Sequence, residues 1–136
     1  RVTIADDQNP ITIRGANSNA KINCTANAFL DMTTATTTEI VALSGSTNIY
    51  ICGYSVVSTG ATATNVRFVQ GTGTNCATSP SNRSANIPLT AAANTVGISR
   101  GGGEGMILKT SSTGQAMCVT SSGAATIAVD VSYAQF

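Results

Sequence analysis

The chain has 136 residues and is 42% hydrophobic, which suits one globular domain with a single core. Only 10% of its residues are charged and its net charge is +1. It therefore has neither the high net charge typical of a disordered chain nor the basic surface of a nucleic-acid-binding protein. It contains no run of about 18 apolar residues, so we expect no membrane-spanning helix, and no signal peptide is visible.

The residue composition favours an all-β fold. Thr, Ser and Ala dominate, and there are 13 glycines. Thr favours strands, while Gly and Asn favour turns. Long amphipathic runs of Glu, Lys and Leu, which would predict helices, are absent.

The first 37 residues differ from the rest of the chain. Two short runs that could be strands, Val2–Ile4 and Ile11–Ile13, are separated by a polar stretch and followed by Cys24 and a Thr-rich segment. We interpret residues 1–37 as an extended N-terminal arm that docks on the domain or on a neighbouring subunit. A mobile tail is the alternative, because chain termini are often loosely held.

Regular strand signals begin at residue 38 and continue to the end of the chain. The clearest is the last segment, where Ile127, Val129, Val131 and Tyr133 alternate with other residues, as expected for a half-buried strand. About eight antiparallel strands at roughly ten-residue spacing are predicted, which favours a β-sandwich of the jelly-roll type for residues 38–136. The predicted strands span residues 39–43, 49–57, 65–70, 87–90, 95–99, 106–110, 115–120 and 125–135.

Four cysteines, Cys24, Cys52, Cys76 and Cys118, are the residues that most constrain the fold. Their wide spacing, without a C-x-x-C pair or any histidine, argues against a zinc site. Two disulfides or buried free thiols fit better, and disulfides are favoured if the protein works outside the cytosol. If the eight strands follow jelly-roll order, the second strand, with Cys52, lies beside the seventh, with Cys118. We therefore expect a Cys52–Cys118 bridge and a Cys24–Cys76 bridge that ties the arm to a polar loop at residues 76–86.

The sequence offers little for catalysis. The absence of histidine excludes Ser-His and Cys-His nucleophile systems. Among the six acids, only Asp6 and Asp7 are close in sequence. The glycine-rich stretch Arg100–Gly105 is followed by a predicted strand, whereas a phosphate-binding loop needs a helix there. We predict no catalytic, cofactor-binding or metal site, and a protein that is not an enzyme; a glycosidase pair of distant acids is the alternative.

Five segments of the chain carry motifs that occur together in one group of proteins. They are Asn48–Tyr54, Asn65–Cys76, Pro88–Thr90, Gln115–Ser122 and the closing strand. They resemble a recurrent family of small tailed-bacteriophage virion proteins, which share an I-Y-I-C-G strand, a G-T-G-T-N-C turn, a C-V/L-T-T/S-S strand and a final Y-x-Q. The resemblance covers roughly residues 38–136 and leaves out the arm.

The resemblance implies a structural protein of the virion, most simply a capsid decoration (cement) protein. Such a protein would bind the major capsid protein or other virion subunits on the outer surface of the head, as a homo-oligomer and specifically a trimer. It would be extracellular after release. We expect no nucleic-acid or membrane partner. Two alternatives remain: a phage fibre or surface domain that binds a receptor or glycan, and an extracellular filament subunit whose arm adds a strand to the next subunit.

Overall fold

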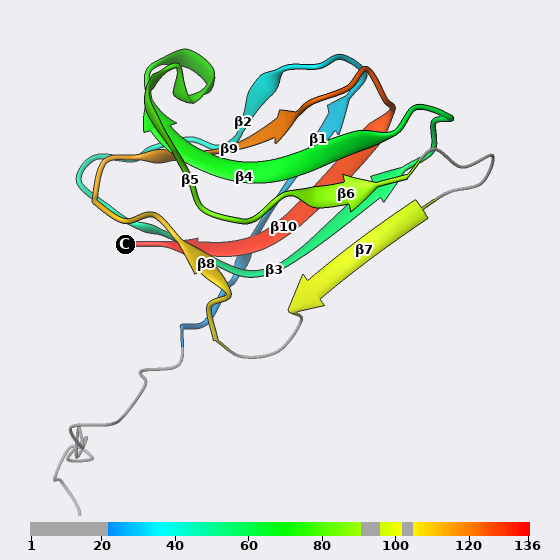
Figure 1. The fold of residues 1–136 in the computed structure, drawn as a ribbon. Coiled ribbons are helices and arrows are strands. Elements are labelled where there is room, and N and C mark those ends of the chain that lie inside the picture. Colours follow the sequence, from blue (N-terminus) through cyan, green and yellow to red (C-terminus); the bar gives the residue numbers. More distant parts are fainter. Residues whose placement is uncertain (1–21, 91–95, 102–104) are drawn as a thin grey trace, which may run out of the picture.

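The computed structural model describes residues 22–90, 96–101 and 105–136. It confirms the all-β prediction, because two antiparallel sheets pack face to face as a β-sandwich (Figure 1). The short runs at residues 2–4 and 11–13, which could be strands by their sequence, lie outside the described residues.

Sheet A contains five strands in the order β1-β10-β3-β7, with β8 also paired to β3. All the pairings are antiparallel. The strands are β1 (Ala26–Met32), β3 (Ile49–Ser58), β7 (Val96–Gly101), β8 (Leu108–Lys109) and β10 (Ile127–Gln135).

Sheet B contains the other five strands in the order β2-β9-β4-β5, with β6 also paired to β4. A short 3-10 helix, η1 (Thr74–Cys76), follows β4. The strands are β2 (Thr37–Val41), β4 (Thr64–Thr72), β5 (Thr78–Asn82), β6 (Ile87–Leu89) and β9 (Ala116–Ser121). The pairing shows a sandwich; the more specific jelly-roll description stays a prediction.

The core lies between the two sheets and explains the sequence periodicity. In β10, Ile127, Val129 and Val131 are fully buried, while Asp130 between them is exposed. Phe68 of sheet B is also fully buried, and its ring centroid lies 4.9 Å from that of Tyr54 in sheet A. Inward-facing apolar residues from both sheets therefore join the layers, as the alternation predicts.

The sandwich begins earlier than the predicted boundary after residue 37. Strand β1 lies inside the segment interpreted as an arm, yet it pairs along its whole length with β10. Residues 1–21 of that segment lie outside the described residues. The structure also places strand β5 within residues 76–86, which were predicted as a polar loop. In β1 three consecutive apolar residues, Ala28 to Leu30, hide the alternation, and in β5 every residue is exposed, so neither strand has a clear periodic signal.

All four cysteines form disulfides, but the predicted pairing is wrong. The bridges are Cys24–Cys52 and Cys76–Cys118. The error follows from the missed β1, which shifts the strand count by one. Counting β1 makes the Cys52 strand the third rather than the second, and places it in sheet A, while Cys118 lies in sheet B beside β2 and β4.

Candidate interaction surfaces

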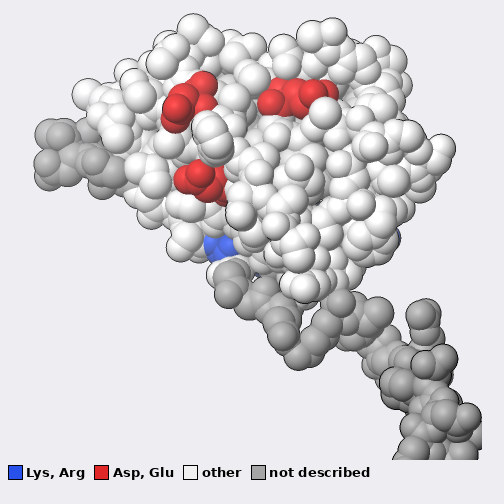
Figure 2. All heavy atoms as spheres, turned by 180° about the vertical axis from the view of Figure 1, so that it is seen from behind, with Lys and Arg blue, Asp and Glu red and all other residues white. Residues whose placement is uncertain are grey.

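The described ionisable residues are dispersed over the surface. Figure 2 shows acidic side chains as separate patches on a face that otherwise carries almost no charged side chains. The described acids are Asp31, Glu39 and Asp130. Within the described ranges, no three His, Cys, Asp or Glu side chains come close enough to hold a metal ion. Asp6, Asp7 and Glu104 lie outside these ranges.

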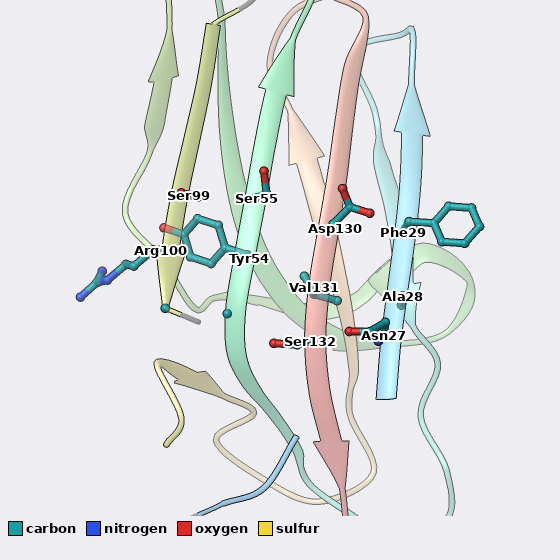
Figure 3. A pocket seen from close by; sticks show the side chains of 12 residues that line it. Asn27, Ala28, Phe29, Tyr54, Ser55, Ser99, Arg100, Asp130, Val131 and Ser132 are labelled. Atoms are coloured by element: carbon teal, nitrogen blue, oxygen red, sulfur yellow. The ribbon is translucent and has the colours of Figure 1, made fainter. Parts of the chain in front are cut away.

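The outer face of sheet A is broad and built from small side chains. Register places Phe29, Asp130, Ser55 and Ser99 opposite one another on four neighbouring strands (Figure 3). The next row along the strands contains Asn27, Ser132, Gly53 and Gly101. A shallow depression of about 380 Å³ lies across both rows. We call this surface the sheet A face.

Where β3 and β7 pair, their backbones are so close that no side chain rises from the sheet A face at residue 101. Gly101 has a φ of +83°, and a Cβ atom placed there would lie 2.2 Å from the carbonyl oxygen of Cys52 and 2.7 Å from the Cα of Gly53. A side chain at residue 101 therefore has no room. Glycine at this position lets the two backbones approach and leaves a depression beside Ser55.

Phe29 is the one large apolar side chain in these two rows, and 79% of it is exposed. It lies on β1, which ends the strand order of sheet A. Figure 3 shows its ring pointing away from the neighbouring Asp130. A single exposed apolar side chain is common on protein surfaces, so Phe29 makes this face a candidate docking site only together with the edge of β1 beside it, which is unpaired within the described residues.

The outer face of sheet B differs, because η1 covers part of it. Val69, Ala116 and Cys118 point outward from sheet B yet are buried, and together with Cys76 of η1 they form a second small core. The Cys76–Cys118 bridge fixes this cover to β9. Asn75 adds a hydrogen bond, since its Oδ1 accepts from the backbone N–H of Glu39 on β2 at 3.0 Å.

The cover leaves a hollow beside it. Two neighbouring cavities, of about 290 and 450 Å³, adjoin at the lining residues Val69, Asn82 and Thr120, which they share. We call the two together the sheet B groove. Arg67 of β4 lies in it, and both its Nε and Nη2 donate to Oδ1 of Asn86, at 2.9 and 2.6 Å. Arg67 is the one charged residue among those that line the two described cavities.

Sequence analysis did not identify either surface. The alternation of β10 predicts that Asp130 faces outward, but Phe29 lies in a segment that was not predicted as a strand. Arg67 and Asn86 are separated by 19 residues, and only the pairing of β6 with β4 brings them together. The outward-pointing cysteine in β9 is the one sequence signal that could have indicated a cover over sheet B.

Two disulfides are typical of proteins that work in an oxidising, extracellular environment. In the part of the chain that the structure describes, no helix is long and apolar enough to span a bilayer. No protein-family model, curated protein or solved structure matches this chain.

Proposed function

We propose that this chain is a non-enzymatic structural protein of a phage virion, a decoration protein that binds the outside of the head through its sheet A face. The resemblance of the sequence motifs supports the virion assignment, and the exposed Phe29 on the sheet A face supports the choice of docking surface. A protein with this role works without turnover outside the cell. Two disulfides suit such service, because each stabilises the fold by about 3 to 4 kcal/mol in the chain-entropy account.

The exposed Phe29 is the observation that supports docking most directly. A flat face of small residues can approach a neighbouring subunit closely, and one aromatic side chain then supplies the buried anchor around which such interfaces are organised. The backbone edge of β1 beside Phe29 could also pair with a strand of the partner. The partner in this proposal is the major capsid protein or another virion subunit, and the decorating species is a homotrimer.

Binding to capsids tests the docking surface. We expect Phe29→Ser to weaken co-sedimentation with heads of the encoding phage by at least about tenfold, which is typical for loss of a central aromatic anchor. Leu43→Ser is the matched control, because Leu43 is also exposed but lies on the segment after β2, outside the sheet A face. Equal binding by F29S and the wild type would overturn this assignment of the docking surface.

The expected arm is tested separately. If residues 1–20 lead the docking, a chain that starts at residue 21 will keep its fold but fail to decorate heads. The mass of the intact, non-reduced protein, measured by light scattering after size exclusion, tests the oligomer. A closed trimer supports decoration at symmetry axes, whereas a monomer or open polymers would favour an isolated binding domain or a filament subunit.

A further inference from the structure

The sheet B groove is a polar site that docking through the sheet A face would leave free. The outer faces of the two sheets point in opposite directions in a sandwich, so a protein held by the sheet A face presents the groove away from its partner. The groove runs across β4 and β9, with the η1 and β5 segments along one side. All the residues that line the groove belong to the described part of the chain, so the groove is present whether or not the protein docks through the sheet A face.

Hydrogen-bonding side chains dominate the lining of the groove. Register places Thr37, Thr120 and Arg67 opposite one another on β2, β9 and β4. Within the described residues, the exposed side-chain amides of Asn65 and Asn82 have no intramolecular hydrogen bond. Each amide therefore offers donors and an acceptor to a ligand. Val69 on the floor and Pro80 on the rim supply small apolar contacts.

Arg67 is held in place before any ligand arrives. Its bonds to Asn86 fix the guanidinium plane while leaving the remaining N–H groups free. Asn86 takes the Nε–H and one Nη2–H, so the end-on pair of Nη1–H and the second Nη2–H is the planar fork that can bind a carboxylate through two parallel hydrogen bonds. The described acid on this face, Glu39, lines neither cavity, so it does not occupy the fork.

We propose that the sheet B groove binds a carboxylated glycan, with the sugar carboxylate on Arg67 and the hydroxyls on the Asn and Thr side chains. Two adjoining cavities can hold neighbouring sugar units of one oligosaccharide. The residues that line the described cavities include no aromatic ring, so hydrogen bonds rather than stacking carry the binding. We therefore expect a dissociation constant on the order of 1 mM for a short oligosaccharide.

Oligosaccharides of uronic acids test this proposal. Oligogalacturonate and oligomannuronate are the probes, and methyl-esterified oligogalacturonate is the neutral control with the same ring and hydroxyl groups. In NMR titrations up to about 10 mM, at least one uronate should shift amides of β4, β5 and β9, while the methyl ester should bind at least about tenfold more weakly. The absence of binding by both uronates, or equal binding of acid and ester, would overturn the proposal.

Two arginine variants locate the site. Arg67→Gln should reduce uronate affinity by at least about tenfold, because the charged fork is lost. Arg83→Gln is the control, since Arg83 donates from Nε to the carbonyl of Lys109 and does not line the groove. Equal losses in both variants would show general charge attraction, which also contradicts a built site. Head binding should be unchanged in R67Q, so failure of this proposal is distinguishable from failure of the decoration role.

Discussion

The two outer faces of this sandwich follow the same strand alternation but differ in what lies over them. In the two rows of the sheet A face most outward residues are small and no segment of the described chain lies over them, and Phe29 stands exposed at the edge. On sheet B the outward Val69, Ala116 and Cys118 are buried again under η1. An outward position in a strand is therefore not always exposed to solvent. A short segment that lies over such positions can bury them in a second core and leave a groove at its border.

The disulfide that holds the cover should contribute most to stability. In the chain-entropy account, Cys76→Ala with Cys118→Ala costs about 4 kcal/mol. The pair also releases η1, where Asn75 and Cys76 have φ of +54° and +56° and keep a left-handed backbone that is unfavourable without support. Urea unfolding with matched Cys24→Ala, Cys52→Ala protein gives the comparison. We expect the second pair to lose less, about 3 kcal/mol, because Cys24 is only half-buried and precedes β1.

If loss of the Cys24–Cys52 bridge costs more, then fixing the segment before β1 to sheet A stabilises the fold more than fixing η1 to sheet B does. Equal losses would show that neither the longer loop nor the covering η1 gives the Cys76–Cys118 bridge an advantage.

Adding one methyl group by a Gly→Ala substitution should lower the unfolding free energy on sheet B but hardly on sheet A, an effect of intermediate size. At Gly71 of β4, a Cβ would lie 2.8 Å from the carbonyl oxygen and 2.9 Å from the Cβ of Cys76, so Gly71→Ala must push η1 outward. We expect a loss of about 1 to 3 kcal/mol in unfolding free energy. Gly97→Ala is the control on sheet A, where the nearest atom is Val57 Cγ2 at 3.4 Å, and we expect a change below about 0.5 kcal/mol. Similar values for both variants would show that η1 is not tightly seated.

Two substitutions of exposed side chains should change stability least and yet separate the two proposed binding activities most clearly. Phe29→Ser and Asn82→Ala each alter an exposed side chain, so both should change the unfolding free energy by less than about 0.5 kcal/mol. In binding assays we expect opposite effects. F29S should lose binding to phage heads but keep binding to uronate oligosaccharides, and N82A should lose uronate binding but keep head binding. Loss of both activities in either variant would contradict two independent surfaces.

Strand periodicity predicted the fold where one face of a strand meets the core. Ile127, Val129 and Val131 have the expected alternation and all are buried. The pattern fails in β1, where exposed Phe29 sits between half-buried Ala28 and Leu30, so three consecutive apolar residues hide the alternation. It also fails in β5, where every residue is exposed and none is strongly apolar.

The disulfide pairing and both surfaces depend on contacts between distant segments. The pairing requires a correct strand count, and one missed strand moved Cys52 to the wrong sheet. The groove requires β5 to pair beside β4 and η1 to cover the sheet, and the polar sequence at 76–86 gives no periodic signal for either. Composition and alternation therefore predict layers and core, whereas cover, groove and bridges are properties of the assembled sheet.

The Cys24–Cys52 bridge also determines how the sandwich would carry a mechanical load. In sheet A, β10 lies between β1 and β3. The bridge therefore joins the chain just before the edge strand β1 directly to β3 in the middle of the sheet. A pull on the chain ahead of Ile22 is transmitted covalently to β3, instead of unzipping β1 from β10 one hydrogen bond at a time. A subunit tethered through that segment would therefore resist tension until its central strands shear, and reduction of one disulfide would remove that resistance.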